Sequence, residues 1–423
     1  MYKKISAITI ADALTKGVGY LLLPLYLGLM PQQEFGEFSF IFSSIAPFSL
    51  VITLSLYIPF IRTFCEDKSN NSSRSELVST VFNSLFIWLI IIDFILLLVK
   101  PFFINTYINY FNITYFADEK YYLVLMLVNT GAILLYCYSL LMSRKNTYEI
   151  IIFMLVRFIF VSGSSLAFVY FDFLGHESVL NRLFGIFVAE FFVAFSYVFV
   201  YVRPYVSLKI NFSILKDQLI IAWPLVPSGL IGLFLVIIDR GLIAEHHGLK
   251  ELASYNLSMM ALVPLQMLMS ATQVAWAPHI FSLNSAQEAM KQTIRIIKIA
   301  FFIMIVGAVF LSLLIYLALL YSFIGSEYSV VPEIILYSSI GVIASVLTHF
   351  NSNMFVHLKK TGYQLGIGLL ILAINWSINI ALIADYSFIG AAIAAGLANV
   401  IGLIVGIVIL NKLVNRSTQK VVA

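Results

Sequence analysis

Long apolar runs alternate with short polar connections along the whole chain. A helix needs about 20 apolar residues to cross about 30 Å of hydrocarbon. Runs this long and this uniformly apolar predict helices, because a closed barrel would show short segments of alternating polarity instead. Twelve runs meet the length: roughly 5–30, 36–64, 77–99, 121–143, 150–171, 183–202, 218–243, 253–278, 299–323, 334–357, 364–384 and 390–411. The pattern predicts an all-α integral membrane protein with twelve transmembrane helices.

Composition supports this interpretation. Of the 423 residues, 61% are hydrophobic and 11% are charged, whereas soluble domains have about 45–50% apolar and about 25% charged residues. The apolar excess extends from end to end, which favours a multi-pass protein over a soluble domain with one anchor. Cys65 and Cys137 fall in different spans and lack the spacing of metal ligands. We therefore expect no metal site, no cofactor and no nucleic-acid partner.

Basic residues are distributed unequally between the two sides of the membrane. Most of those outside the spans lie in connections on the side of the N-terminus, while the other side has only Lys100, Lys120, Arg182 and Lys250. Cytoplasmic connections of membrane proteins carry the excess of Lys and Arg. Both termini are therefore predicted to be cytoplasmic. The longest connection on the other side, 100–120, is aromatic and is expected to lie in the membrane interface.

The polar, basic segment 203–217 divides the predicted spans into two groups of six. We expect an N-terminal six-helix bundle over 1–205 and a C-terminal six-helix bundle over 206–423. Because six is even, both bundles begin on the cytoplasmic side. If they are repeats, they are parallel repeats related by an axis along the membrane normal.

Several ionisable residues fall inside the predicted spans. A charge at the bilayer centre costs about 2.5–3.5 kcal/mol, so such residues normally face a bundle interior or a wet cavity. Lys16 is predicted near the midplane, Arg157 toward the cytoplasmic face and Arg240 toward the external face. Their cationic side chains would suit an anionic substrate. The acids in the spans are candidates for binding a coupling cation: Asp12, Asp93, Glu190 and Asp239.

Structural roles for the same residues stay open. Asp12 and Lys16 are four residues apart on one helix face and could neutralise each other. Arg157 could pair with Glu190 on the next helix, and Arg240 could extend to the external headgroups. Asn375 and Asn379 share a face of the eleventh span, where they could bind sugar hydroxyls or link neighbouring helices.

Prolines cluster in the first two predicted spans of each half. A proline in a helix removes one hydrogen bond and kinks it. The positions are Pro24, Pro47, Pro59, Pro224, Pro227 and Pro264. Their placement predicts bent helices in spans 1, 2, 7 and 8, where bending would serve alternating access.

Three stretches carry a family resemblance: LLLPLYLGLMPQQEFGEFSF at 21–40, WPLVPSGLIGLFLVIIDRGLIAEHHGLKELASYNLSMM at 223–260 and QVAWAPHIFS at 273–282. They resemble bacterial polysaccharide flippases of the Wzx type. That group belongs to the multidrug/oligosaccharidyl-lipid/polysaccharide exporter superfamily, with the MATE drug exporters and the lipid II flippase. The resemblance extends over the whole chain in length, span count and division into halves.

The resemblance implies a MATE-like arrangement of two six-helix bundles around a central cationic cavity. It also implies a bacterial inner-membrane protein that moves an undecaprenyl-diphosphate-linked oligosaccharide from the cytoplasmic to the periplasmic leaflet. The product would be O-antigen of lipopolysaccharide or another surface polysaccharide, made together with other assembly proteins. In related flippases, bases on the first, second and eighth helices matter. The cationic cavities of this group match Lys16 and Arg157 here, and Arg62 is a further candidate for substrate binding, but the eighth span has no base.

Two other functions stay open. A MATE-like exporter of small organic molecules, coupled to H⁺ or Na⁺, is typically lined by acids at mid-depth, whereas the mid-depth residue here is Lys16. A membrane-embedded polysaccharide polymerase would need a large external loop for its catalytic groups, and the longest predicted external connection is only 100–120. We therefore expect no enzymatic activity.

Overall fold

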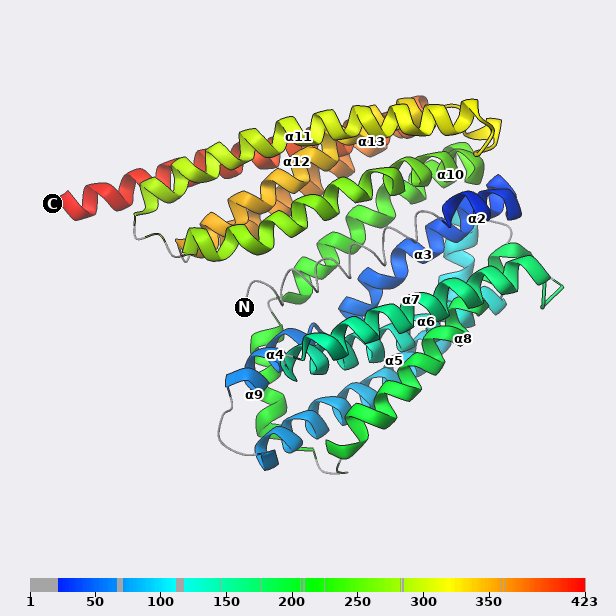
Figure 1. Ribbon diagram of the computed structural model, residues 1–423, viewed down its shortest axis with the longest axis horizontal. Helices are drawn as coiled ribbons and strands as arrows, with labels where there is room; N and C mark the ends of the chain where they lie inside the picture. Colours follow the sequence, from blue (N-terminus) through cyan, green and yellow to red (C-terminus); the bar gives the residue numbers. More distant parts are fainter. Residues whose placement is uncertain are drawn as a thin grey trace. The chain divides into compact units, whose positions relative to one another are not determined.

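The computed structural model is helical throughout the part of the chain that it describes (Figure 1). That part is residues 22–422 without 67–70, 112–117, 145, 176, 206, 208–209, 224, 282, 284, 359 and 361. The prediction of an all-α protein is confirmed for these residues. The chain divides into two compact units, Met1–Val236 and Ile237–Ala423.

The first unit is built around α6 (Asp118–Arg144). This helix packs against α3 (Gln32–Ile52), α4 (Tyr57–Glu66) and α8 (Ser178–Tyr197). The helix α7 (Thr147–Phe171) packs along α8, and the short α2 (Leu23–Leu29) contacts α7. The remaining helices of the unit are α5 (Asn71–Phe111), α9 (Phe212–Ala222) and the beginning of α10.

The connection after α8 is fastened to the first unit. A π-helical turn, Val198–Val202, and a 3₁₀ turn, Arg203–Tyr205, end α8. Oγ of Ser79 on α5 then donates to the carbonyl of Ser207, and Gln218 of α9 donates to Thr63 of α4 at 2.8 Å. These contacts place α9 with the first compact unit. The division into six-helix bundles over 1–205 and 206–423 stays a prediction.

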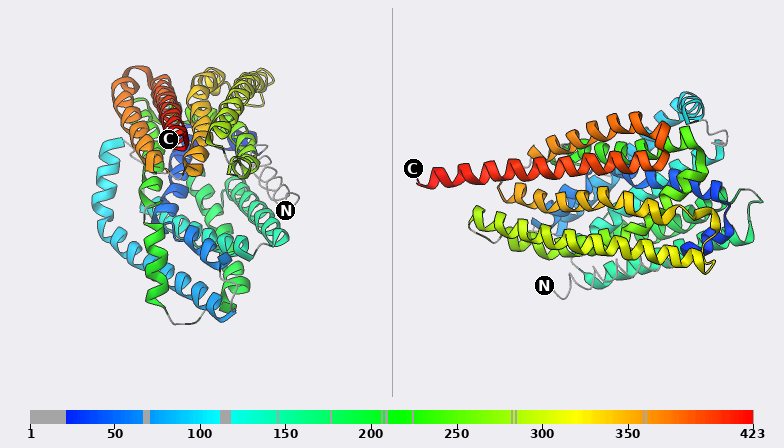
Figure 2. Two further views of the ribbon diagram at one scale, coloured as in Figure 1. Left: turned by 90° about the vertical axis from the view of Figure 1, so that its left-hand side faces the viewer. Right: turned by 90° about the horizontal axis from the view of Figure 1, so that it is seen from above.

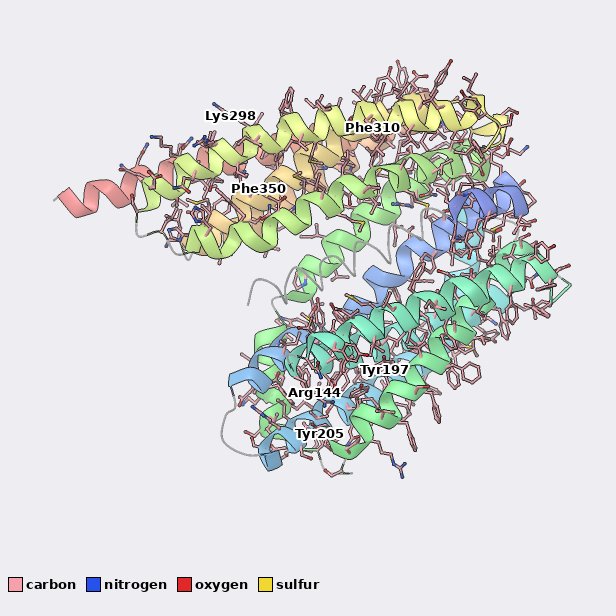
Figure 3. All side chains as sticks on the ribbon, viewed as in Figure 1. Arg144, Tyr197, Tyr205, Lys298, Phe310 and Phe350 are labelled. Carbon is pink, nitrogen blue, oxygen red and sulfur yellow. The ribbon has the colours of Figure 1, made fainter. Side chains whose placement is uncertain are left out.

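The second unit contains most of α10 (Leu225–Phe281), with α11 (Ala286–Leu320), α12 (Val331–His357) and α13 (Gly362–Val422). A 3₁₀ turn, Ser326–Tyr328, connects α11 to α12. The helices α11, α12 and α13 run side by side in every view (Figure 2). Large apolar side chains such as Phe302 and Phe310 are exposed on α11, as expected of a surface that faces lipid, and Figure 3 labels Phe310.

Two of these helices bend sharply at one residue. Gly248 in α10 has φ 84°, a left-handed value that glycine adopts without a steric cost. Ser387 in α13 has φ 50°. The bends separate the predicted spans 218–243 from 253–278 and 364–384 from 390–411.

The predicted span 36–64 is not one continuous helix. It breaks between α3 and α4, where Leu54 and Ser55 adopt positive φ values of 50° and 53°. Pro59 explains the position, because proline lacks an N–H and its ring clashes with the carbonyl of Ser55. The break leaves the Ile52 carbonyl outside the helical pattern, and Nε1 of Trp88 on α5 donates to it at 2.9 Å.

The predicted loop 100–120 is partly wrong, because α5 continues through Pro101 to Phe111. Seven stretches of the described chain are long and apolar enough to cross a membrane, and one of them, Gly362–Asn415, includes two predicted spans. This is a multi-pass membrane protein. The count of twelve transmembrane helices stays a prediction.

Candidate functional site

A buried carboxylate lies at the centre of a polar cluster in the second unit. Asp239 sits in the first limb of α10 and is 7% exposed. Its Oδ1 accepts a hydrogen bond from Nδ2 of Asn379 at 2.6 Å, and its Oδ2 accepts one from the hydroxyl of Tyr255 at 3.3 Å. The bend at Gly248 returns the chain so that Tyr255, in the second limb of α10, lies beside Asp239.

The two asparagines predicted to share a helix face do so. Asn375 and Asn379 lie one turn apart on α13, and Nδ2 of Asn379 donates to Oδ1 of Asn375 at 3.0 Å. Both are buried, Asn379 completely. Oδ1 of Asn379 has no hydrogen-bond donor among the described residues. These amides link α13 to α10, as in the structural role that the sequence left open. Their contact with sugar hydroxyls stays a prediction.

Arg240 follows Asp239 in the chain but has a different partner. Its Nε donates to Oδ1 of Asn256 at 2.8 Å, and its side chain is half-buried. Asn256 belongs to the second limb of α10, next to Tyr255. The adjacent acid and base are thus each held by a neutral side chain from the same helical turn, and Arg240 is bound inside the unit instead of extending freely away from it.

This cluster can hold a small cation or a proton. Asp239 supplies one negative charge, and its carboxylate accepts hydrogen bonds from two uncharged groups and interacts electrostatically with Arg240. A buried carboxylate needs hydrogen bonds or a cation to offset the loss of hydration. The oxygens of Asn375, Asn379 and Tyr255 are hard ligands of the type that alkali and alkaline-earth cations prefer. The arrangement is therefore suited to reversible binding of H⁺ or Na⁺.

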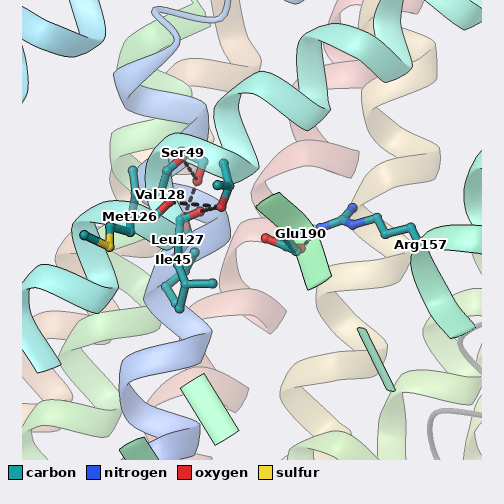
Figure 4. Close-up of polar contacts among 8 residues, drawn as sticks. Ile45, Ser49, Met126, Leu127, Val128, Arg157 and Glu190 are labelled. Carbon is teal, nitrogen blue, oxygen red and sulfur yellow. Dashed lines mark hydrogen bonds and ion pairs between the residues drawn. The ribbon is translucent and has the colours of Figure 1, made fainter. Parts of the chain in front are cut away.

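The predicted pairing of Arg157 with Glu190 is confirmed. Nη2 of Arg157 on α7 donates to Oε1 of Glu190 on α8, which joins the two helices (Figure 4). Glu190 is buried, with 8% of its side chain exposed, whereas 43% of the Arg157 side chain is exposed. One edge of the guanidinium thus compensates a buried acid while the rest stays accessible. Its role toward a substrate stays a prediction.

Asp93 has a neutral partner within the first unit. It lies on α5, and its Oδ2 accepts a hydrogen bond from Nδ2 of Asn129 on α6 at 2.7 Å.

The side chains of three other candidate residues lie outside the described part of the structure. Asp12 and Lys16 lie outside the described residues, and Arg62 lies in α4 with its side chain outside the described part.

The sequence did not predict a buried ion cluster in the first unit. Lys120, counted above as an external loop charge, is 1% exposed. Its Nζ lies 2.6 Å from Oε1 of Glu37 on α3 and 2.7 Å from Oε2 of Glu177, the residue before α8. Arg182 is also buried, and its guanidinium stacks 3.7 Å from the ring centroids of Tyr26 and Phe38. Lys120 and Arg182 each lie at the edge of an apolar run, which had suggested that both bases belong to solvated loops.

The comparisons with known proteins concern the fold. No family model matches the chain, and no curated protein matches it either. Among solved structures, it is similar to the lipid II flippase MurJ in an inward closed conformation. That match has a TM-score of 0.74 and 13% identity, and covers 96% of this chain and 87% of the other.

Two further structures have the same fold. One is an inward-facing multidrug resistance MATE family transporter of the MOP superfamily, with a TM-score of 0.65 and 14% identity over 96% of this chain and 99% of the other. The other is a MOP superfamily transporter from Pyrococcus furiosus whose binding pocket is described as having reverse polarity. It has a TM-score of 0.61 and 16% identity over 98% and 96% of the two chains. The chain has the fold of these transporters.

Proposed function

We propose that the protein is a flippase for undecaprenyl-diphosphate-linked oligosaccharides. It moves repeat units of O-antigen or another surface polysaccharide from the cytoplasmic to the periplasmic leaflet of a bacterial inner membrane, with both termini in the cytoplasm. The observation that carries the proposal is the fold shared with a lipid II flippase along 96% of the chain. A protein of this fold can handle a lipid whose headgroup is too polar to cross hydrocarbon.

Basic side chains in the helices support an anionic substrate. Phosphate prefers Arg and Lys as partners. Arg240 is held by the neutral amide of Asn256, and the accessible edge of Arg157 lies inside a predicted span. We assign the diphosphate to these arginines together with Lys16 and Arg62. The amides of Asn375 and Asn379 complete the proposed substrate contacts.

Coupling to a cation gradient is assigned to the second unit. Among the buried carboxylates of the described residues, Asp239 has the most neutral hydrogen-bond partners, and occupation by H⁺ or Na⁺ would alter its bonds to Asn379 and Tyr255. The bond to Asn379 connects α13 to α10, and the bond to Tyr255 connects the two limbs of α10, so occupation of this one small site would change how these segments pack. Asp12, Asp93 and Glu190 are the other coupling candidates.

One observation favours a second function. The same fold occurs in a multidrug resistance MATE transporter, and a buried acid such as Asp239 would suit export of small organic molecules coupled to a cation. The two functions differ in the substrate that the protein removes from the cytoplasmic side. An exporter would lower the sensitivity of cells to organic cations, whereas the flippase would leave that sensitivity unchanged.

Deletion and complementation of the gene test the proposal. Cells without the gene should accumulate lipid-linked repeat units on the cytoplasmic leaflet, and the intact gene should relieve the accumulation. A matched variant, Asp385→Asn at an exposed position, should relieve it equally well. Deleted cells with normal surface polysaccharide and normal lipid-linked intermediates would refute the flippase.

A further inference from the structure

The end of α10 forms a second polar cluster with α12. Nδ2 of Asn353 on α12 donates to Oε1 of Gln273 on α10 at 2.5 Å. One turn further along α10, the ring of Trp276 meets the ring of Phe350 edge-on at 6.3 Å and lies 5.6 Å from the ring of His279 (Figure 3 labels Phe350). All these side chains belong to the second unit, and Gln273, Trp276 and His279 lie in the stretch 273–282 that contributes to the family resemblance.

Two hydrogen-bond donors in this cluster lack an acceptor among the described residues. They are Nε2 of Gln273 and Nε1 of Trp276, and both nitrogen atoms are buried although their side chains are only half-buried. A buried donor without an acceptor costs about 1–3 kcal/mol, and a buried indole N–H normally has a partner. The cost would be recovered when a ligand oxygen approaches these groups, because Gln273 and Trp276 both lie at a partly exposed edge.

The chemistry of the cluster selects the kind of ligand. Gln273, Trp276, Phe350 and Asn353 carry no charge, so they offer little to a phosphate, which prefers Arg and Lys. The hydrogens of the amide and indole N–H groups carry partial positive charge, which disfavours the binding of an organic cation. A sugar ring fits both features: its hydroxyl oxygens accept hydrogen bonds from amides and indole, and its C–H face can lie against an aromatic ring.

We propose that Gln273, Trp276 and Asn353 form a subsite for one pyranose ring of the glycan. The assignment rests on the proposed function, because it names the part of the lipid-linked oligosaccharide that the second unit binds. Trp276 supplies the aromatic surface and one donor. Gln273 supplies the second donor and is held in place by Asn353.

Equilibrium binding to the purified full-length protein tests this subsite. The protein is kept in a detergent without a sugar headgroup and titrated separately with N-acetylglucosamine, galactose and rhamnose, with the acyclic polyol mannitol as the reference. Tryptophan fluorescence is the signal, and the chain has four tryptophans. At least one pyranose should give a saturable change that mannitol does not give.

Matched variants locate the signal. Trp276→Phe keeps an aromatic ring but removes the donor, and it should abolish the change, whereas Trp376→Phe at an exposed position should retain it. Gln273→Leu should weaken binding about fivefold, the loss expected for one hydrogen bond of about 1 kcal/mol.

The subsite is refuted if no pyranose exceeds mannitol, or if Trp276→Phe and Trp376→Phe respond alike. It is also refuted if the cation tetraphenylphosphonium alone gives the Trp276-dependent change. Sugar binding without translocation in cells would refute the flippase and leave the subsite standing, while translocation without sugar binding would refute only the subsite.

Discussion

Nδ2 of Asn379 donates to Oδ1 of Asp239 at 2.6 Å, across 140 residues of sequence. The bond joins α13 to α10 and completes a set of neutral partners around a buried carboxylate. The two side chains that donate to Asp239 in this set are neutral, and the charge of the adjacent Arg240 also acts on it. This relationship is the structural basis for the coupling proposal.

Asp239→Asn should therefore uncouple transport. The amide has the same shape as the carboxylate but carries no charge, so the helices should still pack while cation binding is lost. Translocation of lipid-linked oligosaccharide should lose its dependence on the Na⁺ or H⁺ gradient and fall at least tenfold, as expected when about 1.4 kcal/mol or more of coupling free energy is removed. Gradient dependence equal to that of the Asp385→Asn control would contradict the assignment.

The pair Arg157–Glu190 can be separated into structural and transport roles. Arg157→Gln leaves the buried acid Glu190 without its cation and should lower the unfolding temperature. The double variant with Glu190→Gln should recover most of that loss, giving a coupling energy of about 0.5–3 kcal/mol in a double-mutant cycle. Thermal unfolding in detergent measures both. If Arg157 also binds phosphate, the double variant will be stable but inactive; a stable and fully active double variant would remove Arg157 from the substrate contacts.

Lys120 should matter for stability more than any exposed lysine. Lys120→Met leaves Glu37 buried without its cation, and breaking a buried ion pair from one side costs about 3–5 kcal/mol. The unfolding midpoint of the purified protein should fall accordingly, while Lys291→Met at an exposed position should leave it unchanged. Equal midpoints for the two variants would show that the cluster contributes little.

The break in the second predicted span should depend on Trp88. Trp88→Phe keeps the ring but removes the hydrogen bond to the Ile52 carbonyl, which should cost about 1–3 kcal/mol if that carbonyl stays buried without a donor. Hydrogen exchange should increase at 53–56 in this variant. The matched change Trp376→Phe should have no such effect. Unchanged exchange at 53–56 in Trp88→Phe would mean that the indole does not stabilise the break.

Local features of the sequence predicted part of this structure. Apolar runs predicted the helices, and the short connection between α7 and α8 made the contact of Arg157 with Glu190 foreseeable. The four-residue spacing of Asn375 and Asn379 likewise predicted a common face. Each of these follows from the helical repeat or from adjacency in the chain.

Local sequence features did not predict the contacts between helices that are distant in the chain. The bond from Asn379 to Asp239 depends on how α10 folds back at Gly248 and meets α13, which no local pattern encodes. Lys120 was expected to be solvated, because a lysine at the end of an apolar run is indistinguishable from a loop charge. Its burial depends on Glu37 and Glu177, which lie in two other parts of the chain. The helix break at Leu54 and Ser55 was expected only as a kink at Pro59.

Translocation by the purified protein is the most direct test of the proposed function. The protein is reconstituted into liposomes that contain an undecaprenyl-diphosphate-linked oligosaccharide, and a membrane-impermeant reagent labels the glycan of the outer leaflet. With a Na⁺ or proton gradient in place, the intact protein should make the inner-leaflet pool reactive as well, and the Arg240→Gln and Asp239→Asn variants should leave it protected. An inner-leaflet pool that stays protected in the presence of the folded, intact protein under both gradients would contradict the flippase.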